Sequence, residues 1–303
     1  MRVLSRREFL QITGAAAGIL PARNAWPASE TPLSLPTNIS HSTVEWTPAG
    51  KGLEFAKIDV LVDKKSIDTL AVLRVNPAFN QIRVFNSYEP GKTIPRTIEQ
   101  WQESTGALAM INGAQYMADP YYMPCALVIC DGKSKGPGSN PNVRGMLVAE
   151  PVRPGLPKAD LLDFEYDRHA AGSYSQGVQH WPILLDRNGK VKVKDTPLRA
   201  ARSIVAKDFS GNLLFMTTEA KYFTLYNLGM FLKYSRARSD HGLNVHTAMN
   251  LDGGTEASMI IRSEKISYLH YGSGSTDKSA GNLGFLNWKV KLPGAIGVFP
   301  RNT

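Results

Sequence analysis

The residues best suited to chemistry lie in one short stretch, Asn250 to Ser258, which reads Asn-Leu-Asp-Gly-Gly-Thr-Glu-Ala-Ser. Apolar runs precede and follow it, and the glycine pair predicts a sharp turn at the end of a buried strand. Two carboxylates, Asp252 and Glu256, fall within this turn. Polar loops on rigid strands commonly carry binding and catalytic groups. Taken alone, the stretch also fits a structural turn with Asp-Gly chemistry.

Three other strand-like segments end in polar residues in the same way. In chain order they contribute Asn112 with Gly113, Gln179 with His180, and Arg202 with Glu219 across a hairpin. Lone histidines such as His180 are more often structural. Neither Asp240-His241 nor His246 stands in a tight metal-ligand spacing.

Arg202 is the expected phosphate ligand, because the planar guanidinium fits a phosphate better than a lysine ammonium does. Arg199 and Arg144 are alternatives, and a surface salt bridge is the simpler interpretation of Arg202. The net charge of +9 suits an anionic ligand. Without a dense Lys/Arg run, nucleic acid is not an expected partner.

In this order, the segments resemble the phosphodiester glycosidase family over roughly residues 108–299. The matching motifs are Asn112-Gly113 with Tyr116, Gln179 with Pro182, Arg202, Asn250 to Gly254, and Pro293 to Val298. The resemblance implies cleavage of a sugar C1–O bond, with a phosphate monoester as leaving group. The last pKa of such a group is about 6, so it needs little protonation and one carboxylate could suffice.

The chemistry of the polar residues suggests a role for each. Asp252 is the expected nucleophile or base, and Glu256 and Glu219 are candidates for a second carboxylate. Expected substrate contacts are Asn112, Gly113, Gln179, His180, Arg202, Asn250, Gly253, Gly254, Thr255 and Ser258. The sequence departs from the family pattern at Ala114 and at Thr255-Glu256, where the family usually has Gly-Ser.

Two other functions stay open: a metal-assisted phosphodiesterase that breaks P–O, and a non-catalytic protein that binds glycans or sugar phosphates on the same fold. No cofactor is expected. A divalent cation held by Asp252 and nearby amides is an alternative that no ligand spacing indicates.

The elements that must position these residues are mostly short β-prone runs. They include residues 55–62, 69–76, 82–87, 108–112, 126–130 and 145–149, and hairpins around 186–189 and 208–212. Two helices are predicted, one from Thr93 through Glu103 and one capped by Thr224. Strands without a regular βαβ rhythm predict a single α+β domain, with mixed, mostly antiparallel sheets and a few packed helices.

The N-terminus predicts export. Arg6-Arg7 before Phe9-Leu10 resembles a twin-arginine signal over residues 1–28, followed by a linker over 29–45 and the domain over 46–301. We therefore expect a periplasmic or secreted protein and the twin-arginine machinery as a partner. The apolar run of about nine residues is too short for a stable membrane span. Cys125 and Cys130 share one predicted strand, too far apart for a disulfide.

Overall fold

The computed structural model describes residues 39–117, 121–236, 242–272 and 289–301. These residues form eighteen strands in three antiparallel sheets and two α-helices. The predicted α+β class is therefore wrong, because the described chain has a predominantly β fold. Strands such as Ala159–Asp163 and Ser267–Tyr271 were not expected. The predicted signal peptide lies outside the described residues.

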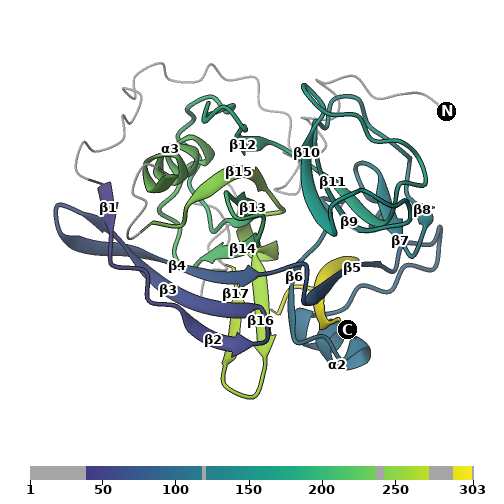
Figure 1. Cartoon of the computed structure of the whole chain (residues 1–303), viewed down its shortest axis with the longest axis horizontal. Coiled ribbons are helices and arrows are strands. Elements are labelled where there is room, and N and C mark those ends of the chain that lie inside the picture. The colour runs from purple at the N-terminus through teal and green to yellow at the C-terminus, as the bar shows by residue number, and fades with distance from the viewer. Residues whose placement is uncertain (1–38, 118–120, 237–241, 273–288, 302–303) are drawn as a thin grey trace, which may run out of the picture.

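The first sheet has eight strands, and its long strands β3 and β4 lie at the left in Figure 1. Its order is β1-β3-β4-β14-β13-β15-β12, and β2 also pairs with β3. The strands are β1 (Ile39–His41), β2 (Thr47–Gly50), β3 (Leu53–Val62), β4 (Lys65–Val75), β12 (Ile183–Leu185), β13 (Ser203–Asp208), β14 (Leu213–Thr218) and β15 (Val245–Asn250).

Two five-stranded sheets complete the fold. The second sheet, at the right in Figure 1, has the order β10-β9-β11-β7-β8, and the third has the order β17-β16-β6-β18-β5. The second contains β7 (Val128–Cys130), β8 (Lys133–Lys135), β9 (Gly145–Pro151), β10 (Ala159–Asp163) and β11 (Tyr174–His180). The third contains β5 (Asn80–Asn86), β6 (Ala109–Asn112), β16 (Ser258–Arg262), β17 (Ser267–Tyr271) and β18 (Gly294–Pro300).

The largest hydrophobic core lies where the three sheets face one another. In β14, Leu213 and Phe215 enter this core, whereas Leu214 and Met216 pack on the opposite face, toward the helix α3 (Leu225–Arg236). Successive side chains of a strand point to opposite faces, so a sheet covered on both sides has apolar residues at nearly every position. This pattern lacks the simple alternation of a half-exposed strand.

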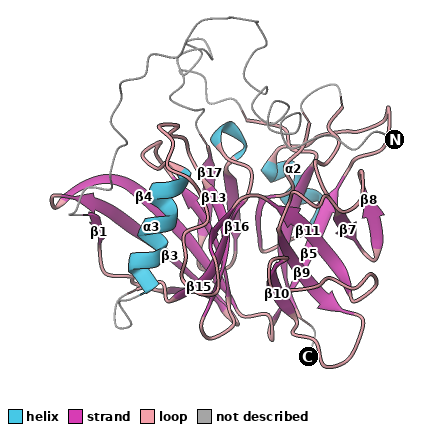
Figure 2. Ribbon diagram, turned by 90° about the horizontal axis from the view of Figure 1, so that it is seen from above, coloured by secondary structure: helices cyan, strands magenta, loops and turns pink. Residues whose placement is uncertain are grey.

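Each helix covers the outer face of one sheet, and the two are well separated in Figure 2. Helix α3 (Leu225–Arg236) begins as predicted, with the Thr224 hydroxyl accepting from Asn227 N–H at 3.0 Å. Helix α2 (Ile98–Thr105) starts later than predicted, at a capping box of Thr97 and Gln100. The preceding residue, Arg96, instead forms a β-bridge with Leu292. No helix among the described residues has the length and apolarity to cross a membrane.

Candidate active site

The Asp-Gly-Gly turn carries the chain from the first sheet to the third. Strand β15 ends at Asn250, a 3-10 helix spans Gly254–Glu256, and β16 begins at Ser258. The register pairs Asn250 with Ile204, and Met259 with Ile111. The start of β13 and the end of β6 therefore lie at the same edge as the turn. This topology brings Asn112, Arg202 and the turn together at one edge.

Asn112 holds both ends of the turn. Its Nδ2 donates to the main-chain oxygen of Asp252 at 2.8 Å, and its Oδ1 accepts from Ser258 N–H at 3.3 Å. The Ser258 hydroxyl donates to the main-chain oxygen of Glu256 at 2.9 Å. Both side chains are buried, Asn112 at 1% exposure and Ser258 at 0%. We interpret them as positioning residues for the carboxylates.

The glycines of the site allow neighbouring backbone segments to pack closely against them. Gly254 has φ +72°, a conformation that L side chains rarely adopt, and its N–H donates to Ala201 O at 2.8 Å. A Cβ on Gly253 would lie 3.0 Å from the same Ala201 oxygen, and one on Gly113 would lie 2.9 Å from Ala295 N. The N–H of Gly113 donates to Gly294 O at 3.2 Å. These N–H groups are thus engaged within the protein.

Asp252 and Glu256 are both half-buried and act on each other electrostatically. Burial raises the pKa of Asp252 well above its usual range, and the charge of Glu256 raises it further, against one hydrogen bond from Gly253 N–H. Burial also raises the pKa of Glu256, although the Thr255 hydroxyl donates to its Oε2 at 2.7 Å. Two interacting carboxyls of this kind hold a proton between them more readily than two exposed ones.

Arg202 lies directly before β13 and beside Gly253, where a Cβ would stand 3.7 Å from its Nη1. Its Nε donates to Phe223 O at 3.2 Å and its Nη2 to Leu198 O at 2.8 Å. Within the described residues, no carboxylate forms an ion pair with it, and its Nη1 makes no hydrogen bond. Burial lowers its pKa to about 10, which leaves the guanidinium charged at neutral pH. A buried cation without a carboxylate partner is suited to an anionic ligand.

Tyr116 and Cys125 lie near the carboxylates and were not among the predicted site residues. Burial raises the pKa of the Tyr116 hydroxyl, and the charges of Glu256 and Asp252 raise it further. Burial and the charge of Asp252 raise the pKa of the Cys125 thiol to about 12. The aromatic four residues after Asn112 was a visible signal for Tyr116. No sequence signal links Cys125 to Asp252.

Gln179 and His180 are built into the protein interior. The Gln179 amide is fully engaged: Oε1 accepts from Leu127 N–H and Asn140 N–H, and Nε2 donates to Val143 O at 2.9 Å. His180 is 0% exposed, and burial lowers its pKa to about 3. Neither of its ring nitrogens has a partner among the described residues.

Asn250 and Gln115 meet at one carbonyl. Gln115 Nε2 donates to Trp181 O at 2.7 Å, and Asn250 Nδ2 donates to the same oxygen at 3.4 Å. Trp181 directly follows β11, so this contact links the second sheet to the turn edge. The Oδ1 of Asn250 is buried and has no partner within the described part of the chain.

Glu219 directly follows β14 but is engaged elsewhere. Its Oε1 lies 2.8 Å from Lys57 Nζ and accepts from the Tyr268 hydroxyl at 2.9 Å. This ion pair and hydrogen bond connect the first sheet to β17. Unlike Asp252 and Glu256, Glu219 is not joined to the turn by any hydrogen bond between described residues.

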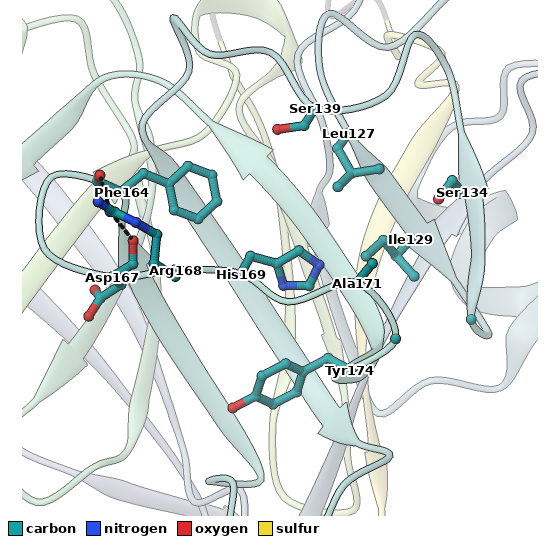
Figure 3. Close-up of a pocket in the computed structure, with 12 residues that line it drawn as sticks. Leu127, Ile129, Ser134, Ser139, Phe164, Asp167, Arg168, His169, Ala171 and Tyr174 are labelled. Atoms are coloured by element: carbon teal, nitrogen blue, oxygen red, sulfur yellow. Dashed lines mark hydrogen bonds between the residues drawn. The ribbon is translucent and has the colours of Figure 1, made fainter.

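A hollow of about 420 Å³ lies away from the turn, against the second sheet. Figure 3 shows His169 beside Tyr174 and Ile129 on its wall, with Phe164 and Arg168 at one side. None of the predicted site residues lines it. Across the described ranges, no group of three or more His, Cys, Asp or Glu side chains is arranged to hold a metal ion.

The family model for phosphodiester glycosidases matches residues 105–299. The chain belongs to the phosphodiester glycosidase family. The matched segment includes Asn112, Arg202 and the whole turn, so the site described above lies within the family domain. A search of curated proteins finds no match.

Solved structures agree with the phosphodiester glycosidase fold. The catalytic domain of zebrafish N-acetylglucosamine-1-phosphodiester alpha-N-acetylglucosaminidase, auto-inhibited by its pro-peptide, superposes with a TM-score of 0.57 at 15% identity. The match covers 88% of this chain and 89% of that domain. A protein from Synechocystis gives a TM-score of 0.54 at 13% identity, over 86% of this chain and 64% of that one. At these identities the likeness concerns the fold alone.

Proposed function

We propose that this chain is an exported hydrolase that cleaves a sugar from a sugar phosphodiester on a cell-envelope or extracellular glycan. The observation that carries the proposal is the buried Arg202 guanidinium, which has no carboxylate partner among the described residues and lies beside the turn that holds Asp252 and Glu256. Export rests on the Arg6-Arg7 pattern near the N-terminus.

The arrangement separates two tasks. Arg202 binds the phosphate through its free Nη1 edge and neutralises the charge that develops on the leaving group. The ionised member of the Asp252–Glu256 pair attacks C1 or takes a proton from the attacking water. A phosphate monoester leaves readily at neutral pH, because its last pKa is about 6.

The remaining predicted residues support this centre. Asn112 and Ser258 fix the turn, Gly253 and Gly254 allow its close approach to Ala201, and Thr255 holds the Glu256 carboxylate. Tyr116 lies near both carboxylates. An aromatic ring in a polar site is a common contact surface for a ligand.

The proposal is tested by hydrolysis of the methyl phosphodiester of α-N-acetylglucosamine 1-phosphate, chosen because the zebrafish protein is named for an N-acetylglucosamine-1-phosphodiester. We expect release of free sugar, reduced by about 10²- to 10⁴-fold in Asp252→Asn with an unchanged circular dichroism spectrum. Saturable binding of the diester without turnover would instead favour a glycan-binding protein. Wild-type turnover in Asp252→Asn would contradict the assignment of the turn.

A further inference from the structure

The turn holds one carboxylate more than cleavage of a phosphodiester requires. Asp252 and Glu256 lie on the two sides of Gly253-Gly254, and the 3-10 helix folds Glu256 back over the turn. A Cβ on Gly254 would lie 3.8 Å from Glu256 Oε2. The charges of both carboxylates raise the pKa of the nearby Tyr116 hydroxyl. The two carboxyls therefore belong to a single site.

This pair is poorly placed to carry two negative charges. Both groups are half-buried within one five-residue turn, burial raises the pKa of each, and the charge of Glu256 raises the pKa of Asp252 further. No lysine or arginine forms an ion pair with either one among the described residues. Like-charged carboxyls in such surroundings retain one proton when the first has ionised. The site thus contains a proton donor and an ionised carboxylate together, the combination that ordinary glycosidases use.

Two buried polar groups indicate that a ligand completes this site. Arg202 is 6% exposed, and its Nη1 has no hydrogen-bond partner in the described chain. Asn250 is 5% exposed, and its Oδ1 also has no partner there. The buried Asn250 Oδ1 is costly without a partner, so a donor such as a sugar hydroxyl would stabilise it. The charged Nη1 of Arg202 would gain a charge-assisted hydrogen bond from a bound anion.

We propose that this chain also hydrolyses glycosides that carry no phosphate, with the Asp252–Glu256 pair protonating the leaving oxygen. The inference rests on the proposed function, because it uses the same site. As the C1–O bond breaks, the protonated carboxyl gives its proton to the leaving oxygen, which departs as an alcohol. The ionised carboxylate supplies an electron pair to C1 or to a proton of water. One water is consumed, its hydroxyl bonds to C1, and its proton restores the acid.

The acid matters only for a poor leaving group. Without protonation, a glycoside would have to expel an alkoxide, which is far more basic than the phosphate monoester anion. General acid catalysis contributes about 10²- to 10⁴-fold in such cases. A phosphodiester gains much less from protonation. The dependence of the rate on the leaving group therefore reports the acid directly.

The experiment compares three α-N-acetylglucosaminides that differ in their leaving groups: the 1-(methyl phosphate), the 4-nitrophenyl glycoside and the methyl glycoside. We expect the wild-type protein to hydrolyse all three. Turnover of the phosphodiester with no turnover of the methyl glycoside would overturn this inference and leave the proposed function standing. Failure to hydrolyse any of the three would contradict both.

Variants of the pair test its role, with Glu264→Gln as the matched control because Glu264 is exposed and lies outside the turn. In Asp252→Asn and Glu256→Gln, we expect different leaving-group profiles. Asp252→Asn should lose activity on all three substrates, because Asp252 supplies the ionised carboxylate. Glu256→Gln should lose about 10²- to 10⁴-fold on the methyl glycoside and at least tenfold less on the phosphodiester. Equal losses on all three substrates in both variants would overturn the assignment of a general acid.

A pH profile separates this role from a structural one. For the methyl glycoside, kcat/KM should have a bell-shaped dependence on pH, because one carboxyl must be protonated and the other ionised. For the phosphodiester, only the acidic limb should be present. The same single limb for both substrates would contradict protonation by the pair.

Discussion

Asn112 Nδ2 donates a 2.8 Å hydrogen bond to the main-chain oxygen of Asp252, which lies 140 residues further along the chain. The opposite end of the same amide accepts from Ser258 N–H. One buried side chain at the end of β6 therefore fixes the segment that carries both carboxylates. Because the bonds run to the backbone, Asn112 positions the turn without using the carboxylate oxygens.

Replacing Asn112 with alanine should loosen the turn and lower activity. The substitution leaves the half-buried Asp252 carbonyl and the buried Ser258 N–H without the Asn112 amide, which costs about 1–3 kcal/mol. A misplacement of about 1 Å at a reacting centre costs about 10²-fold in rate. We expect both losses in urea unfolding and in kcat. The exposed Asn142→Ala is the control and should change neither; a fully active Asn112→Ala would show that the clamp is dispensable.

Asp252→Asn should stabilise the protein while removing its activity. The pKa of Asp252 is raised in the folded state, so folding favours its protonated form. The stability from that proton is present at low pH and is lost as the pH rises from the usual aspartate range through the folded pKa. Asparagine does not ionise, so the Tm of the variant should exceed that of wild type increasingly as the pH rises. A Tm difference that shrinks with rising pH would contradict the burial of this carboxyl.

Part of this structure was predictable from local sequence. The hairpin at residues 208–212 and helix α3 follow from turn residues and from a capping threonine beside an apolar stripe. The convergence of Asn112, Arg202 and the turn was expected from the family-like order of their motifs. Their chemistry could be proposed because the side chains themselves indicate it: an arginine can bind a phosphate, and a carboxylate can act as nucleophile or base.

Other features depend on contacts that sequence does not encode locally. Helix α2 starts later than predicted because Arg96 forms a β-bridge with Leu292, which lies almost two hundred residues later in the chain. Gln179 is a polar residue in a family-like motif, yet the structure uses its amide to fasten backbone groups. Cys125 lies close enough to Asp252 for the charge of that carboxylate to raise its pKa, although the two residues are far apart in the chain.

Arg202→Lys should weaken binding of the anionic substrate. Lysine keeps a positive charge but loses the fork that donates to Phe223 O and Leu198 O while presenting Nη1. Loss of one hydrogen bond to a charged group costs about 1.5–3 kcal/mol, or about 10- to 100-fold in KM for the phosphodiester. Inhibition by inorganic phosphate should weaken in parallel. The exposed Arg153→Lys serves as the control, and an unchanged KM in Arg202→Lys would remove Arg202 from the phosphate site.

Thr255→Val should move the basic limb of the activity profile on the methyl glycoside to higher pH. The Thr255 hydroxyl donates to Glu256 Oε2 and so stabilises the ionised carboxylate, against the burial that raises its pKa. Without that bond, the pKa of Glu256 should rise further, so Glu256 should keep its proton to higher pH. The measurement is the pH dependence of kcat/KM on the methyl glycoside. A basic limb that stays in place, or moves to lower pH, would contradict Glu256 as the proton donor.

The most direct test of the central claim, that this turn breaks a sugar C1–O bond, is hydrolysis of the sugar phosphodiester in water labelled with oxygen-18. Mass spectrometry of the two products locates the label. We expect cleavage at C1, which places the label in the free sugar and leaves the phosphate monoester unlabelled. Label in the phosphate, with an unlabelled sugar, would mean that the P–O bond breaks and would contradict it.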